Sequence, residues 1–210
     1  MSEPRDDRDD IALLARWRGG DAAAGETLTR RSFRMVLRFF DTKAPAQALD
    51  LTQQTFLALS EGRGRAEIRS SFRAYLLGIA RYTLIAHLRQ HYRAPEAFEP
   101  EHSSVLDALP DPASSPTARL QGHQQRAQVV QALRRLPLDH QIALEMHYWN
   151  ELSIAEIAAV LDCTPGSIKA RLFRARKALQ AAVADLNAGA TPPLAKLVDQ
   201  LSSVAKDPET

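Results

Sequence analysis

Apolar residues recur at three- and four-residue spacing along almost the whole chain, and this helical period restricts the fold more than any other feature. Strand signals are nearly absent, since no Asn-Gly or Asp-Gly pair lies between apolar runs to start a hairpin. We therefore predict an all-α protein. The expected helices cover residues 10–18, 22–41, 45–60, 70–92, 118–135, 138–148, 153–161 and 165–186.

The segment 94–117 differs in composition from everything around it. It holds five prolines and five acidic residues but no Lys or Arg. Because proline removes helical hydrogen bonds and restricts the residue before it, we expect an extended linker here. The chain then consists of two small helical domains, 8–93 and 118–186, followed by a tail, 187–210, that is either a surface helix or a partner-binding segment.

Two helix starts lie close together in the second predicted domain. Ser153 and Glu156 have the spacing of a capping box, in which each side chain satisfies an orphan backbone N–H. Thr164 followed by Pro165 supplies a second N-cap with proline at the first helical position. Two short helices joined by a few residues predict a helix-turn-helix, whose second helix enters the major groove of duplex DNA.

The second helix of this motif has one apolar and one basic side. Ile168, Leu172, Ala175 and Leu179 fall on a single stripe, which we expect to face the core. The stretch 164–180 holds five basic residues and no acid, so its charge is uncompensated. A solvated basic helix is the alternative. The candidate contacts to duplex DNA are Thr164, Gly166, Ser167, Lys169, Ala170, Arg171, Arg174, Arg176 and Lys177.

These DNA-contact candidates differ in the groups that they can reach. We assign base edges to Arg171 and Arg174, because a guanidinium pairs bidentately with guanine. The small residues at the helix start allow a close approach to phosphate, which helix N-termini bind. The remaining basic residues position the protein through phosphate contacts; they are Lys169, Arg176 and Lys177.

The helix expected at 70–92 interleaves arginines with tyrosines. This mixture holds backbone phosphates while aromatic rings stack on unpaired bases. The alternative is that the tyrosines edge the core and the arginines keep the surface soluble. The candidates are Arg73, Tyr75, Arg81, Tyr82, Arg89 and Arg93.

Other classes of protein fit the sequence poorly. With a net charge of only +2, any nucleic-acid surface depends on where the charges lie. The single cysteine, Cys163, excludes an internal disulfide and indicates the cytosol; we expect it, Tyr148 and Trp149 to be core residues. No apolar run is long enough for membrane insertion. The histidines are scattered, and no glycine-rich loop appears, so we expect no metal, no cofactor and no enzyme activity.

Taken together, these segments resemble an extracytoplasmic-function (ECF) sigma factor of bacterial RNA polymerase, over roughly 10–93 and 120–182. The segment LDLTQQTF is similar to the family motif that binds the polymerase clamp helices. The segment 72–93 is similar to the family's helix for the −10 element. The segment 129–179 is similar to the −35-binding domain. The residues implied to bind core polymerase are Asp50, Leu51, Gln53, Gln54 and Phe56.

The resemblance has local departures and further implications. Leu49, Gln54 and Gln141 replace residues usual in the family, and Tyr82 and Ala86 replace the usual Asn and Asp of the −10 helix, which changes the expected −10 preference. The implied partners are core RNA polymerase, promoter DNA and an anti-sigma factor. In the family, the linker threads toward the active-site cleft. The alternative reading is a free-standing helix-turn-helix regulator that binds DNA unaided as a dimer.

Overall fold

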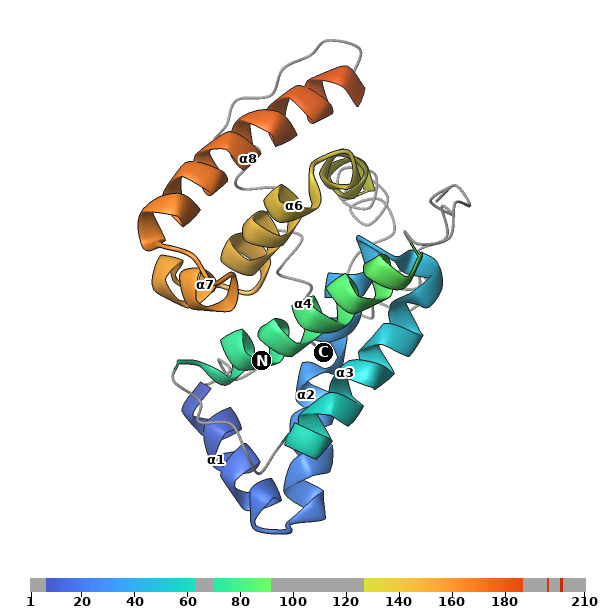
Figure 1. The fold of residues 1–210 in the computed structure, drawn as a ribbon, viewed down its shortest axis with the longest axis vertical. Helices are drawn as coiled ribbons and strands as arrows, with labels where there is room; N and C mark the ends of the chain where they lie inside the picture. The colour runs from blue at the N-terminus through green and yellow to red at the C-terminus, as the bar shows by residue number, and fades with distance from the viewer. Residues whose placement is uncertain (1–6, 63–69, 92–126, 187–195, 197–200, 202–210) are drawn as a thin grey trace, which may run out of the picture. The chain divides into compact units, whose positions relative to one another are not determined.

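The computed structural model describes residues 7–62, 70–91 and 127–186, together with residues 196 and 201. These residues form helices and turns without any strand, which confirms the all-α prediction for the part of the chain described. They fall into two compact units, one on each side of the expected linker (Figure 1). The linker itself, 94–117, and nearly all of the tail lie outside the described residues. No described helix has the length and hydropathy needed to cross a membrane.

The described residues of the N-terminal unit form four α-helices and a short 3-10 turn. Asp21 starts the second helix, because its carboxylate accepts a hydrogen bond from the Ala24 N–H at 3.1 Å. Helices α2 and α3 lie side by side, and α4 crosses them (Figure 1). The elements are α1 (Asp7–Arg18), α2 (Ala22–Asp41), η1 (Pro45–Gln47), α3 (Ala48–Gly62) and α4 (Phe72–His91).

The third helix begins later than the sequence predicted. A single helix was expected over 45–60, but Pro45 starts a 3-10 turn and the α-helix begins at Ala48. Because the proline has no N–H, it fits the first turn and not an α-helical interior. The start of α4 is as expected, since the Ser71 hydroxyl accepts a hydrogen bond from the Ala74 N–H at 3.2 Å.

The core of the N-terminal unit lies among α2, α3 and α4. Phe39 and Phe40 meet edge to face with ring centroids 5.4 Å apart, and both are buried. Leucines from the other two helices complete the core. The fully buried ones are Leu51, Leu59, Leu76, Leu77 and Leu84.

The C-terminal unit contains the predicted helix-turn-helix, whose second helix is long. A helical segment at 127–134 precedes α6 (Leu138–Leu144), η3 (Glu145–Trp149), α7 (Ile154–Val160) and α8 (Pro165–Leu186). The helix expected over 138–148 instead changes at residue 145 into a π-helical turn, η3. The Asn150 N–H donates to the Glu145 carbonyl at 3.0 Å, five residues back, which is the wide hydrogen bond of a π-helical turn.

Both helices of the helix-turn-helix, α7 and α8, begin with the predicted caps. Ser153 and Glu156 form the complete capping box, and the Ser167 N–H donates to the Thr164 hydroxyl oxygen at 3.2 Å. Asp162 turns the chain with a left-handed φ of 51°. Cys163 departs from expectation: it is half-buried in this turn and not part of the core.

Candidate nucleic-acid interface

Helix α8 turns one side toward the core of the C-terminal unit. The predicted apolar stripe of Ile168, Leu172, Ala175 and Leu179 is buried, with no member more than 3% exposed. This stripe packs on α6 and α7. The opposite side of the helix is therefore presented outward.

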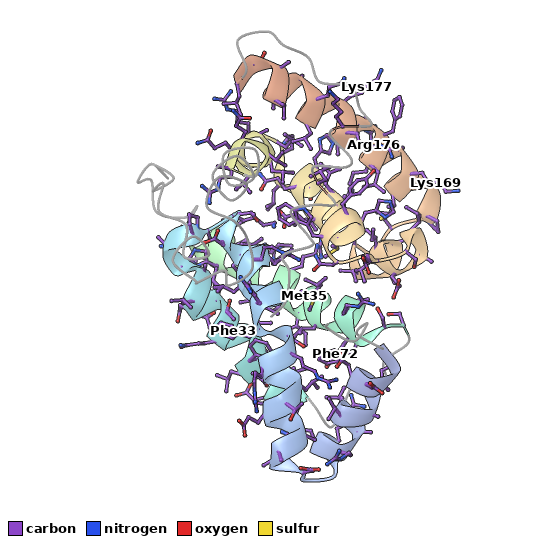
Figure 2. All side chains as sticks on the ribbon, turned by 180° about the vertical axis from the view of Figure 1, so that it is seen from behind. Phe33, Met35, Phe72, Lys169, Arg176 and Lys177 are labelled. Carbon is purple, nitrogen blue, oxygen red and sulfur yellow. The ribbon has the colours of Figure 1, made fainter. Side chains whose placement is uncertain are left out.

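The outward side of α8 is the basic face, which comprises Lys169, Arg171, Arg174, Arg176 and Lys177. Lys169, Arg174 and Lys177 are exposed, and no carboxylate among the described residues pairs with them. Figure 2 shows Lys169, Arg176 and Lys177 spaced along the helix. The four small candidates are also exposed; they are Thr164, Gly166, Ser167 and Ala170.

Arg171 departs from the prediction of an uncompensated face. Its Nη2 lies 3.9 Å from Oδ2 of Asp139 on α6. The acid comes from another helix, so the local stretch 164–180 could not reveal it. Because the Asp139 side chain is 68% exposed, the attraction is weak and solvent-screened.

Arg176 has a partner that the sequence did not suggest. Its Nη1 donates a hydrogen bond to the phenolic oxygen of Tyr148 at 3.2 Å. Tyr148 was expected in the core, but it is half-buried, because the π-helical turn places its hydroxyl against α8. Its ring meets that of His147 edge to face at 4.8 Å.

Phe173 lies on the same side of α8 as the basic face, and the sequence-based prediction missed it. It is 53% exposed, and Lys177 Nζ lies 5.0 Å from its ring centroid. Angular position could have found it, since Phe173 lies four residues from both Lys169 and Lys177 and so shares their side of the helix.

His140 on α6 lies beside the same basic face. Partial burial lowers the pKa of its imidazole, and the positive charges of Arg174 and Arg171 lower it further, while Asp139 opposes them. Its Nδ1 is buried without a hydrogen-bond partner in the described part of the chain. A neutral imidazole is therefore favoured next to the two arginines.

Helix α4 presents a second exposed polar surface, in the N-terminal unit. Tyr82 is 75% exposed and Arg89 is exposed, whereas Tyr75 and Arg81 are half-buried. Tyr75, Tyr82 and Arg89 recur every seven residues, so they share one side of the helix. Arg73 is half-buried, and Arg93 lies outside the described residues.

Helix α3 carries the residues implied to bind polymerase. Asp50, Gln53 and Gln54 are exposed, and the Gln54 amide donates to the Asp50 carboxylate at 2.7 Å. Leu51 is fully buried, so it anchors the helix from inside. Phe56 is half-buried and stacks on Phe33 of α2 at 6.3 Å.

Two leucines add an apolar component to the exposed side of α3. Leu49 and Leu57 are 46% and 58% exposed. They lie four residues on either side of Gln53, which places all three on one stripe of the helix. In the sequence, Leu49 stands out only as a departure from the family, and no pattern marks Leu57.

The two units match two family models. Residues 26–104 match Sigma-70 region 2, and residues 126–179 match Sigma-70 region 4. A helix-turn-helix domain preceded by a region 2 domain defines a transcription initiation factor of the sigma-70 class, which is not an enzyme.

Similar proteins of known class identify the subfamily. The chain is 30% identical over 191 residues to RNA polymerase sigma-H factor of Pseudomonas aeruginosa, covering 84% of this chain and 95% of that one. It is 32% identical over 180 residues to ECF RNA polymerase sigma factor SigC of Mycobacterium tuberculosis, covering 84% and 92%. The chain belongs to the ECF sigma factors, which bind core RNA polymerase and direct promoter-specific initiation.

Solved structures share the fold. The structure of CnrH in complex with the cytosolic domain of CnrY aligns with a TM-score of 0.60 at 22% identity, over 87% of this chain and 99% of that one. The sigma factor RpoE of Bartonella quintana, in complex with the anti-sigma factor NepR, aligns with a TM-score of 0.62 at 21% identity, over 75% and 95%.

Proposed function

We propose that α8 reads the −35 element of a promoter through its basic face and the small residues at its start. The main support is the capped helix-turn-helix. Its second helix exposes Lys169, Arg174 and Lys177, and no carboxylate in the described part of the chain pairs with them. Arg171 and Arg174 read base edges in this proposal, and the lysines bind phosphates. Exposed Phe173 adds an apolar surface suited to a thymine methyl group.

We further propose that the N-terminal unit grips polymerase and the −10 element. The exposed side of α3 offers Asp50 and Gln53 to core polymerase, with Leu49 and Leu57 adding apolar contact. Tyr82 on α4, which is 75% exposed, stacks on an unpaired base, and Arg81 and Arg89 hold the nucleic-acid backbone. Tyr75 and Arg73 complete this surface, to which Arg93 would add a further phosphate contact.

The domain boundaries proposed for this activity are 8–93 for polymerase binding and melting, 94–117 for the linker and 118–186 for −35 recognition. The acidic linker would occupy a polymerase channel that otherwise holds nucleic acid. Two small DNA-binding units gain affinity when a scaffold fixes their separation. Because core polymerase is that scaffold, we expect the chain to work in the cytoplasm.

An anti-sigma factor is the third partner that we propose. The support is the fold shared with RpoE, whose structure holds the anti-sigma factor NepR. Such a partner would cover the exposed stripe of α3 or bind the tail, 187–210, and compete with polymerase. Affinity purification of the full chain from its native cell tests this, and recovery of polymerase alone under inhibiting and inducing conditions would contradict it.

In vitro transcription tests the main proposal. Purified core polymerase with the full chain should produce transcripts from a limited set of sites on genomic DNA, and the chain alone should bind those sites weakly. Tight, unaided binding of the chain to palindromic sites, without any transcript, would instead indicate a free-standing regulator.

Base reading is tested with single variants, by measuring how tightly the holoenzyme binds a set of −35 sequences. We expect Arg174→Ala and Arg171→Ala each to cost about 1–3 kcal/mol of binding and to relax preference at one base pair. Lys177→Ala is the matched control, because losing a phosphate contact weakens all sequences alike. Equal weakening of every −35 sequence by the two arginine variants would contradict the base-reading role.

A further inference from the structure

Tyr148 and Arg176 join two elements that are 28 residues apart in the chain. Tyr148 comes from the π-helical turn η3, and Arg176 comes from the flank of the basic face of α8. We propose that these two side chains bind one backbone phosphate of promoter DNA together, with Tyr148 both contacting the phosphate and positioning Arg176. This inference rests on the proposed −35 reading by α8, and it adds a residue from outside the recognition helix.

The donors of this pair are suited to a phosphodiester. The phenolic oxygen of Tyr148 accepts the Arg176 N–H at 3.2 Å, so its own O–H hydrogen remains available. None of the described residues accepts that hydrogen. Arg176 uses one of its five N–H groups on Tyr148 and keeps the others. A phosphate between them can accept hydrogen bonds from the Tyr148 O–H and from the remaining Arg176 N–H groups. Because the two side chains are hydrogen-bonded to each other, each polarises the other and makes it a stronger donor.

The positive charge of Arg176 is available to bind an anion. Within the described ranges, no carboxylate pairs with its guanidinium, whereas Arg171 on the opposite flank has Asp139 at 3.9 Å. Tyr148 holds the guanidinium without neutralising it. An arginine already held in place loses less side-chain freedom on binding than a free one, which favours the complex.

Tyr148 is itself held by contacts within its own segment of the chain. The His147 ring contacts it edge to face at 4.8 Å, and His147 Nδ1 lies 3.2 Å from the Leu152 carbonyl oxygen. The π-helical turn therefore sets the position of the phenol, and the phenol sets that of the guanidinium. If Tyr148 positions Arg176 in this way, loss of the Tyr148 hydroxyl should weaken DNA binding by displacing the positive charge of Arg176, although Tyr148 itself carries no charge.

The test measures the salt dependence of promoter binding by the holoenzyme. The probe is a promoter duplex recovered from genomic DNA by wild-type holoenzyme, titrated at several KCl concentrations. Arg176→Gln should reduce the slope of log K against log salt by about one, because one phosphate contact is lost. Tyr148→Phe changes no charge, yet we expect a comparable fall in slope and an affinity loss of about fivefold.

Two further measurements separate the proposed pair from a packing contact. The double variant should bind no more weakly than Arg176→Gln alone, because both changes remove one interaction. In a scan of single methylphosphonate substitutions through the −35 duplex, neutralising one phosphate should weaken the wild-type holoenzyme. The same substitution should have little effect on either variant.

The charge control is Arg30→Gln on α2, where Arg30 pairs with Glu26 at 2.9 Å. The salt-dependence slope of this variant should equal that of the wild type.

The outcomes distinguish this inference from the function on which it rests. Wild-type affinity and slope in Tyr148→Phe, beside a weakened Arg176→Gln, would overturn the pair and leave −35 reading intact. Additive losses would also overturn it. A wild-type holoenzyme that retains no promoter would overturn the proposed function and the pair with it. Should Tyr148→Phe lose its helical circular dichroism, the methylphosphonate scan of the wild type decides: no sensitive phosphate in the −35 duplex overturns the pair.

Discussion

Gly25 and Gly78 are both helical glycines, yet their surroundings differ. A Cβ added at Gly25 would lie within 2.6 Å of Cδ1 of Trp17, whereas one at Gly78 would meet nothing within 4 Å. Trp17 reaches Gly25 from α1, so the glycine allows α1 to pack closely on α2. The same substitution should therefore have opposite effects at the two positions.

We expect Gly25→Ala to destabilise the protein by about 1–3 kcal/mol, because the ring of Trp17 must move. Gly78→Ala should be neutral or stabilise by up to about 1 kcal/mol through the higher helix propensity of alanine. Urea unfolding followed by circular dichroism measures both. Equal free energies of unfolding for the two variants would show that the close approach of Trp17 has no energetic consequence.

His140 should make the stability of the C-terminal unit depend on pH. Its pKa in the folded protein is lowered, so the unfolded chain binds more protons near the ordinary histidine pKa. Protonation therefore opposes folding, and the free energy of unfolding should fall as pH drops from about 7 to about 5. His140→Gln should flatten this part of the profile.

Trp149 fluorescence during urea unfolding at each pH measures this free energy, because Trp149 is buried in the same unit. The only other tryptophan of the sequence, Trp17, can be replaced by phenylalanine. Arg174, Arg171 and Asp139 are the charged groups that act on the imidazole. A wild-type pH profile that is indistinguishable from that of His140→Gln would exclude this role.

At the scale of single elements, the caps place α7 and α8. Ser153→Ala removes the acceptor for the Glu156 N–H at 3.2 Å and should destabilise the C-terminal unit by about 1 kcal/mol. Trp149 fluorescence during urea unfolding measures the change. Ser153→Asp keeps an acceptor and should retain most of the stability. A loss as large in Ser153→Asp as in Ser153→Ala would show that the cap is not the cause.

The helices themselves follow from local patterns, but their interruptions do not. The boundaries of α2 and α8 agree with the ranges predicted from periodicity and caps, 22–41 and 165–186. The π-helical turn η3 was missed, since no local residue signals a change of hydrogen-bond register. That turn is what brings Tyr148 to α8.

At the scale of the whole molecule, the proposed function requires a fixed separation between the two units when they bind promoter DNA. If polymerase sets that distance, lengthening the promoter spacer by about half a helical turn, about 5 base pairs, should abolish transcription. Inserting a flexible segment into the linker should not rescue it, because the tether does not determine the spacing. Run-off transcription measures this. Rescue by the longer linker would show that the chain and not polymerase sets the distance.

The sequence by itself determined the all-α class, the helix-turn-helix and the apolar stripe of α8, because capping and helical periodicity act between residues at most a few positions apart. Tertiary structure alone decided which basic side chains remain unpaired. Asp139 approaches Arg171, and Tyr148 binds Arg176, across 32 and 28 residues of chain. Such contacts depend on how helices pack, and local spacing does not specify that packing.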